Sequence, residues 1–267
     1  KTSNKADDVN TEAYYRYQKN YDNLKNGNRC GIACPSRKEV VYVGANDGML
    51  HAFDSNTGSE LWAFIPPTML QSLRKMDSVK ANSSHSVYGV DGSPVVKDIY
   101  YGGKWRTILL TGMGRGGHGY FAMDVTNPNS PSFLFAFQND TINKQIYHWD
   151  ASGNRVDLGY VAGIPAERDY SKLGEAWSTP VIMAMPNGTT RKWVAVFGAG
   201  YNGGVSTDYG SAVYVIDLED EGKVLKKIDL TDVSNNIANS VPATLTAITP
   251  DTTSKAKYKG AMFYFSD

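Results

Sequence analysis

The sequence predicts an all-β protein, and more narrowly a β-propeller built from repeated antiparallel sheets. The 267 residues include 26 glycines, 17 tyrosines, 9 phenylalanines and 5 tryptophans. Chains that are rich in tyrosine and interrupted by glycine are usually all-β. Short β-branched and aromatic runs between glycine turns also recur from Glu39 onward. They are spaced more widely than the roughly 40–50 residues of a plain propeller sheet, so we expect long insertions between strands.

Composition excludes several classes of protein. Lysine plus arginine and aspartate plus glutamate both number 27, so the formal net charge is zero. Because nucleic-acid-binding proteins usually carry a basic excess, we expect no nucleic-acid partner. Apolar residues make up 41% of the chain and charged residues 20%, which argues against disorder. No apolar run approaches the roughly 18–20 residues of a membrane helix. The opening at Lys1 indicates a processed or excised piece.

Residues 1–38 are predicted to form a separate N-terminal segment. Helical spacing of apolar and aromatic residues predicts a helix between Asn10 and Lys25. The residues at this spacing are Tyr14, Tyr17, Tyr21 and Leu24. Cys30 and Cys34 follow at a spacing that suits neither a four-ligand zinc site nor a thioredoxin-like site. We expect a small local disulfide between them, with two free thiols in an intracellular protein as the alternative.

Residues 39–267 are predicted to form the propeller, which opens with three strands. These strands are expected over residues 40–43, 50–53 and 60–64. The segments between them, 46–48 and 54–58, end in glycine and carry turn signals. We therefore expect an antiparallel meander. Apolar residues at positions 69, 70, 73 and 76 then predict one short amphipathic helix.

Two later stretches repeat one pattern of a Ser-Pro or Thr-Pro pair, a strand, a glycine cluster and a strand that ends in aspartate. The first has Ser93-Pro94, 107–110, 112–117 and 120–124, and the second has Thr179-Pro180, 194–197, 198–203 and 213–217. Val241-Pro242-Ala243 resembles a weaker third Ser-Pro segment. The final residues, 263–267, resemble the strand and turn at 42–48. We expect about four sheet units, the last incomplete, in a fragment of a larger propeller.

Motifs that could carry chemistry are interpreted as turns. Both glycine clusters match G-x-G-x-x-G, but a dinucleotide site needs a helix after the cluster and a strand is predicted here. The acidic segments that begin at Asp54 and Asp150 are rich in oxygen, yet their glycines are misplaced for an EF-hand. The segment at Asp217 is interpreted as an acidic surface turn. There is no G-x-S-x-G, and no histidine has a partner that its spacing identifies, so we expect no catalytic residue.

The segment from Val40 to Asp54 resembles the opening sheet of the PilC/PilY family, whose members are type IV pilus tip-associated adhesins and biogenesis factors. The similarity continues through residues 63–67, 88–95, 103–107, 114–126 and 196–202 and spans residues 38–267. The resemblance implies a modified, quinoprotein-like β-propeller. It also implies that this propeller is the C-terminal domain of a much larger secreted protein.

Family members commonly carry a D-x-D-x-D-G calcium loop before the strand that corresponds to residues 261–265. This chain has Pro250 to Lys257 at that place, with Asp251 as the sole acidic residue and two lysines where carboxylates would be needed. A hard divalent cation needs several anionic oxygens. We therefore expect no metal site and no cofactor in this segment, although calcium binding elsewhere in the full-length family stays open.

The resemblance implies a non-enzymatic protein that supports pilus biogenesis against retraction, twitching motility and adhesion to host cells or surfaces. The expected partners are pilins or minor pilins and a host-cell or surface receptor. The expected location is extracellular, at the pilus tip or the outer-membrane surface. Two alternatives are a quinoprotein-type dehydrogenase, since residues 54–62 also resemble quinoprotein repeats, and an outer-membrane assembly scaffold.

Contacts with a partner are expected on the long insertions, because propeller loops commonly carry recognition. These insertions are residues 71–85, 138–173 and 231–240. Tyr147, Tyr160 and Tyr170 lie in the second of them and could anchor a partner. The alternative is that these tyrosines pack locally.

Overall fold

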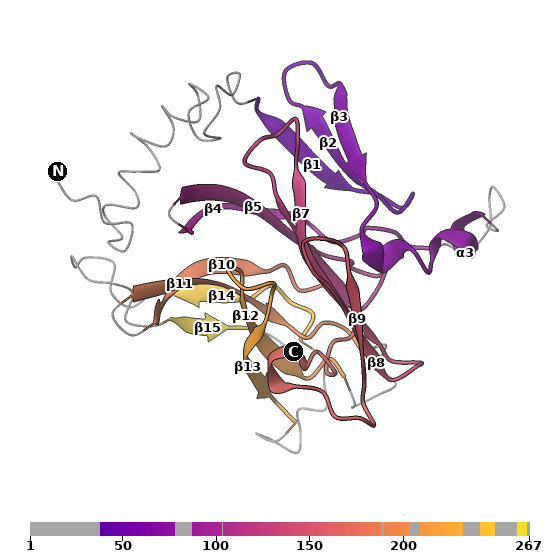
Figure 1. Ribbon diagram of the computed structural model, residues 1–267, viewed down its shortest axis with the longest axis vertical. Helices are drawn as coiled ribbons and strands as arrows, with labels where there is room; N and C mark the ends of the chain where they lie inside the picture. The colour runs from indigo at the N-terminus through magenta and orange to yellow at the C-terminus, as the bar shows by residue number, and fades with distance from the viewer. Residues whose placement is uncertain are drawn as a thin grey trace.

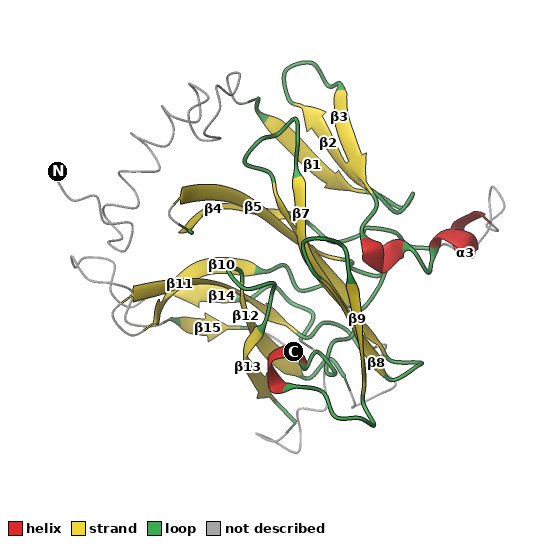
Figure 2. Ribbon diagram, viewed as in Figure 1, coloured by secondary structure: helices red, strands yellow, loops and turns green. Residues whose placement is uncertain are grey.

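The computed structural model describes residues 38–77, 87–102, 104–187, 190–202, 209–231, 241–248 and 261–265. Within these ranges the chain forms four antiparallel sheets that follow one another in chain order (Figures 1 and 2). The prediction of an all-β protein is therefore confirmed. The helix expected between Asn10 and Lys25, the disulfide of Cys30 and Cys34, and Asp251 lie outside the described residues and stay predictions.

The first sheet contains the three predicted strands, β1 (Val40–Gly44), β2 (Leu50–Asp54) and β3 (Glu60–Phe64), paired in that order. Buried and partly exposed residues alternate along β2, as expected where one face of a strand is covered. Gly48 has a φ of 90° in the turn after β1, a conformation that glycine adopts without strain. The expected amphipathic helix is present as two short turns, η3 (Pro67–Met69) and α3 (Leu73–Asp77).

The second sheet has six strands in sequence order. They are β4 (Val95–Tyr101), β5 (Lys104–Gly112), β6 (Gly119–Asp124), β7 (Ser132–Asp140), β8 (Gln145–Trp149) and β9 (Arg155–Gly159). The expected insertion at 138–173 thus contains two further strands, since β8 and β9 extend the sheet beyond β7. The segment after Asp150 is the hairpin turn between them, as predicted, and is closed by its carboxylate. Asp150 Oδ1 accepts hydrogen bonds from the backbone N–H groups of Ser152 and Asn154, both at 2.9 Å.

The third sheet has four strands and the fourth has two. The third consists of β10 (Val181–Asn187), β11 (Thr190–Gly198), β12 (Ala212–Asp217) and β13 (Val224–Asp229). A short turn, η4 (Ala166–Arg168), precedes it. The fourth pairs β14 (Thr246–Ile248) with β15 (Met262–Tyr264).

A pair formed by a basic residue and an aspartate recurs in the first three sheets. In each sheet an aspartate ends one strand and is paired in the register with a residue of the neighbouring strand. The lysine or arginine that contacts the aspartate lies two positions before that paired residue. These cation–aspartate pairs are Lys38–Asp54 at 3.3 Å, Arg106–Asp124 at 2.9 Å and Lys192–Asp217 at 2.6 Å. The same aspartate also accepts the backbone N–H two residues later, which fixes the turn that follows. The three sheets are therefore repeats of one unit.

Successive units meet at three glycines, which we call the glycine joints: Gly44, Gly112 and Gly198. A Cβ atom on them would lie 2.3, 2.5 and 2.1 Å from the carbonyl oxygens of Val90, Ala176 and Val241. Each of these three carbonyl residues lies five positions before the first residue of the next strand, β4, β10 or β14. Val241 therefore corresponds to Val90, and the alignment of Val241-Pro242-Ala243 with Ser93-Pro94-Val95 is wrong by three residues.

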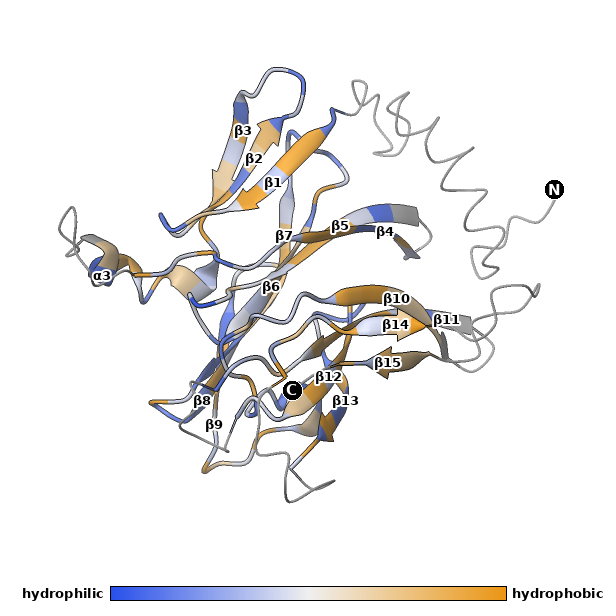
Figure 3. Cartoon of the chain, turned by 180° about the vertical axis from the view of Figure 1, so that it is seen from behind, coloured by the Kyte–Doolittle hydropathy of each residue, from blue (hydrophilic) through white to orange (hydrophobic). Residues whose placement is uncertain are grey.

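Inner strands of the second and third sheets, such as β6 and β12, are buried on both faces. On β5, Ile108 and Leu110 pack toward the third sheet whereas Leu109 packs toward the first. This arrangement explains why these strands are almost continuously apolar in sequence, and Figure 3 shows such a hydrophobic run along β10.

Aromatic rings fill much of the space between the second and third sheets. Phe137 stacks on Tyr170 with ring centroids 3.9 Å apart, and Tyr120 contacts Phe197 at 4.2 Å. The Tyr120 hydroxyl donates a hydrogen bond to the Ser178 carbonyl at 2.8 Å. Large rings with one polar end suit a core that joins two sheets, because each ring buries a large apolar area and its hydroxyl bonds to backbone.

Candidate binding surface

Four side chains form a stacked column across the loops at one end of the second and third sheets. We call this the aromatic column: Tyr88, Arg115, Trp177 and Tyr201. The Arg115 guanidinium lies 4.5 Å from the ring centroid of Tyr88 and 5.9 Å from that of Trp177. Trp177 in turn stacks with Tyr201 at 5.0 Å. The Arg115 Nη1 also donates a hydrogen bond to the Tyr88 hydroxyl at 3.0 Å, so the column is continuous from one end to the other.

The four residues come from four separate segments. Tyr88 precedes β4, Arg115 joins β5 to β6, Trp177 precedes β10 and Tyr201 follows β11. Glycines let these segments touch backbone to backbone: a Cβ on Gly116 would lie 1.7 Å from the Gly89 carbonyl oxygen, and one on Gly200 would lie 1.9 Å from that of Glu175. The predicted turn character of the first glycine cluster is confirmed, because β6 follows it. The second cluster ends at Gly203, outside the described residues, so its prediction is tested only in part.

Backbone hydrogen bonds hold the column in place. Glu175 and Tyr201 exchange two of them, at 2.8 and 2.9 Å, and the Gly114 N–H donates to the Ala176 carbonyl at 3.1 Å. The residues that carry Arg115, Trp177 and Tyr201 are thus tied to each other through main chain. This arrangement fixes the rings before any ligand arrives.

Two carboxylates, those of Asp91 and Glu175, accompany the one charged member of the column, Arg115. Burial raises the pKa of the Glu175 carboxyl group, and the charge of Asp91 acts in the same direction. A hydrogen bond from Trp177 and the charge of Arg115 lower it, without offsetting the effect of burial. Among the described residues, none of the three charged groups forms an ion pair within 4.0 Å. The two carboxylates, Asp91 and Glu175, are therefore available to a charged ligand.

Sequence spacing could not reveal this column, because its members are 27, 62 and 24 residues apart along the chain. The glycine clusters beside Arg115 and Tyr201 were the available signal. They mark where loops approach closely enough for side chains from different sheets to stack.

The tyrosines of the second insertion are not exposed anchors. Tyr170 is fully buried and Tyr147 is 5% exposed. Tyr160 is partly buried and its hydroxyl bonds to Asn139. Local packing, the alternative left open by the sequence, is therefore correct for all three, and the interpretation of Tyr147 and Tyr170 as partner contacts is wrong.

Two of the described histidines, and the aspartates that begin two of the predicted acidic turns, have structural partners. His51 contacts Asp47 and Glu60, and the Nε2 atom of His148 lies 2.9 Å from the Glu221 carbonyl oxygen. Asp54 and Asp217 accept backbone N–H groups of their own turns. Within the described residues, no three His, Cys, Asp or Glu side chains are grouped to hold a metal ion. In the same ranges, no helix is long and apolar enough to cross a membrane.

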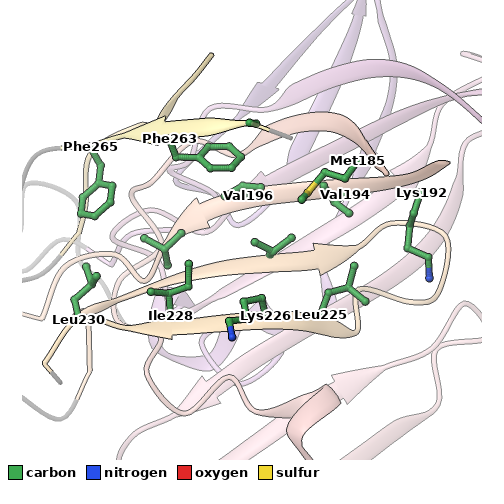
Figure 4. A pocket seen from close by; sticks show the side chains of 13 residues that line it. Met185, Lys192, Val194, Val196, Leu225, Lys226, Ile228, Leu230, Phe263 and Phe265 are labelled. Atoms are coloured by element: carbon green, nitrogen blue, oxygen red, sulfur yellow. The ribbon is translucent and has the colours of Figure 1, made fainter. Parts of the chain in front are cut away.

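A separate apolar groove of about 570 Å³ lies between the third and fourth sheets. Figure 4 shows Phe263 and Phe265 on one side of it, with Ile228 and Leu230 on the other. Its lining continues the third-sheet core, where Val194, Val196, Val213 and Val215 pack against residues of the fourth sheet. We therefore interpret the apolar groove as part of the contact between sheets rather than as a ligand site.

Comparison with known proteins decides the family. The family model described as the PilY1 beta-propeller domain matches residues 8–263. The chain belongs to the PilY1 β-propeller family. The resemblance to PilC/PilY proteins and the predicted propeller fold are thereby confirmed.

Two relatives and one solved structure illustrate the similarity to PilY1. The type IV pilus biogenesis factor PilY1 of Pseudomonas aeruginosa strain UCBPP-PA14 is 33% identical over 205 residues, which are 77% of this chain and 15% of the relative. A PilY1 homologue of Xylella fastidiosa is 37% identical over 186 residues, or 68% of this chain and 12% of the relative. The crystal structure of the P. aeruginosa PilY1 C-terminal domain matches with a TM-score of 0.51 and 30% identity, over 79% of this chain and 34% of that domain. The chain thus spans about a seventh of the length of the P. aeruginosa relative.

Proposed function

We propose that this chain is the propeller part of a non-enzymatic surface protein that supports type IV pilus biogenesis and adhesion. The observation that carries the proposal is membership of the PilY1 family, whose relatives are described as pilus biogenesis factors. The proposed partners are pilins or minor pilins and a host-cell or surface receptor. The proposed location is outside the cell, at the pilus tip or the outer-membrane surface.

The biogenesis role predicts a specific genetic result. Deleting the gene in the source bacterium should reduce surface pili, measured by immunoblot of sheared pilin, and should abolish twitching motility. If the protein antagonises retraction, deleting the retraction motor as well should restore the pili. Normal piliation in the first deletion strain would contradict the proposal, and loss of pili that the second deletion does not restore would contradict its antiretraction part.

The adhesive role is measured separately from biogenesis. In the strain that lacks both the protein and the retraction motor, pili are present but adhesion to epithelial cells should fall. Complementation with the intact gene should restore adhesion. Equal adhesion with and without the gene would limit the role to biogenesis.

The absence of enzymatic activity and of cofactors is part of the proposal. The purified chain should neither develop quinone absorbance after incubation with pyrroloquinoline quinone and calcium nor reduce a redox dye with alcohol substrates. The segment around Asp251 should bind no calcium in calorimetric titration. Micromolar calcium binding that is lost in Asp251→Ala would overturn that last expectation.

A further inference from the structure

The aromatic column leaves a large part of one tryptophan open to solvent. Trp177 is 42% exposed, although Arg115 lies over its ring and Tyr201 stacks with it. Tryptophan, tyrosine and arginine are the three residues most enriched in the energetic centres of protein–protein interfaces. A sugar would need an open ring face for stacking, and here those faces already carry neighbours. The exposed ring edges therefore suit a protein partner better than a carbohydrate.

The column is also rigid in the way that strong interfaces require. Its loops contact each other through main chain at Gly116 and Gly200, and paired backbone hydrogen bonds join Glu175 to Tyr201. A surface whose side chains are fixed in advance loses less conformational entropy when a partner binds. Tyrosine, tryptophan and arginine displayed on glycine-rich loops are likewise the composition of antibody binding loops.

The charges beside the column indicate what the partner presents. Two carboxylates, Asp91 and Glu175, accompany one guanidinium, and Arg115 is already engaged with the ring and hydroxyl of Tyr88. The raised pKa of Glu175 means that its charged form is destabilised where it stands. The charge of Arg115 does not offset this effect, and neither carboxylate forms an ion pair within 4.0 Å among the described residues. A carboxylate whose charged form is destabilised in this way is characteristic of a site kept for binding.

We propose that the aromatic column is the centre of a protein-docking surface, and that the partner places a lysine or arginine side chain beside Asp91 and Glu175, against the edge of Trp177. A cation there is attracted by both carboxylates, and the aliphatic part of its side chain can pack against the edge of the indole ring. The proposal does not depend on the pilus role, since it is tested on the purified chain alone.

The test uses blocked pentapeptides of identical flanking sequence with lysine, norleucine or glutamate at the centre. Each is titrated into the ¹⁵N-labelled 267-residue chain while the Trp177 indole N–H resonance is followed by NMR. The lysine peptide should bind at least about 10-fold more tightly than the glutamate peptide, because like charges at an interface are repelled. Norleucine should bind with intermediate affinity. Chitotriose serves as a carbohydrate probe and should leave the resonance unmoved.

Three variants and one control locate the binding. Glu175→Gln and Asp91→Asn should each weaken the lysine peptide by about 3-fold to 10-fold and leave the norleucine peptide unchanged. Trp177→Ala should weaken both peptides, and its other resonances report whether it folds. The matched control is Glu167→Gln, which removes an exposed carboxylate from η4 and should change neither peptide.

Several results would overturn the proposal. They are equal affinity for the lysine and glutamate peptides, unchanged lysine-peptide binding in Glu175→Gln, or no shift of the Trp177 resonance at about 10 mM peptide, well above the range of weak specific contacts. Binding of chitotriose at Trp177 in place of the peptides would assign the surface to carbohydrate instead.

Discussion

His51 lies between two carboxylates on the first sheet. Its Nε2 atom is 2.9 Å from Asp47 and its Nδ1 atom is 3.1 Å from Glu60. Burial lowers the pKa of His51, but the hydrogen bonds and charges of Glu60 and Asp47 more than offset burial and raise it above 6.5. Protonated His51 therefore links the Asn-Asp-Gly turn to β3.

We expect an NMR titration to give a His51 pKa above 6.5, and Glu60→Gln to lower that value. Because the pKa is higher in the folded chain than in the unfolded chain, the stabilisation is complete below about pH 6.5. It is lost as the pH rises through the folded-state value. His148 is the internal control, since burial lowers its pKa. A His51 pKa at or below that of His148 would show that the two carboxylates do not hold the proton.

The cation–aspartate pairs differ in burial from sheet to sheet, so they differ in expected energy. Asp217 is 2% exposed in its pair with Lys192, whereas Asp54 and Asp124 are 10% and 12% exposed in theirs. The Arg155–Asp157 ion pair on β9 is not one of the three and is more open, with Asp157 41% exposed. Asp217→Asn keeps an acceptor for the turn but leaves the lysine without its buried partner. We expect it to reduce the free energy of unfolding by about 2–3 kcal/mol in urea denaturation.

Asp157→Asn is the exposed control and should change stability by less than about 0.5 kcal/mol. Equal losses in the two variants would mean that the buried Lys192–Asp217 pair contributes no more than an exposed ion pair.

The glycine joints are where one sheet unit meets the next. The Cβ of Gly112→Ala would lie 2.5 Å from the Ala176 carbonyl oxygen, and that of Gly198→Ala would lie 2.1 Å from the Val241 carbonyl oxygen. Backbone cannot yield as a flexible side chain does, so each variant should lose about 2 kcal/mol or more of stability.

Gly159→Ala provides the matched control, because nothing lies within 4 Å of its added Cβ. It should be neutral to within about 0.5 kcal/mol by thermal or chemical denaturation. Unfolding curves for Gly112→Ala that overlay those of Gly159→Ala would show that the joints have room to relax.

Local patterns predicted the strands well, and long-range contacts explain what they missed. The Asn-Asp-Gly turn and the β-branched runs of the first sheet act within a few residues, so their pairing follows from sequence. The position of Val241 in the repeat does not follow from sequence, because it is defined by the packing of the Val241 carbonyl on Gly198 rather than by the Val-Pro pair itself. Residues 138–173 also lacked alternation strong enough to distinguish β8 and β9 from a loop. The aromatic column is assembled from four loops, which no periodicity connects.

At the scale of the whole molecule, the sheets stabilise one another face to face. The second sheet has one face buried against the first sheet and the other against the third. Tyrosines take part in this packing more than in the aromatic column, since Tyr120, Tyr170 and Tyr214 are fully buried. The core between sheets therefore accounts for part of the tyrosine content of the sequence.

The apolar groove is where such a face remains partly open. Leu225 and Ile228 line it and are 47% and 42% exposed. Exposed apolar surface of this kind binds hydrophobic dyes and promotes association. Replacing both residues with glutamate should therefore lower the fluorescence of bound ANS by about half and reduce self-association in sedimentation velocity. Since both side chains are already half exposed, the free energy of unfolding should change by less than about 1 kcal/mol.

Ile142→Glu is the control, because Ile142 is 88% exposed on a turn outside the groove. If the double variant and the control bind equal amounts of dye, the groove is closed in solution and the fourth sheet packs more tightly on the third than its geometry shows.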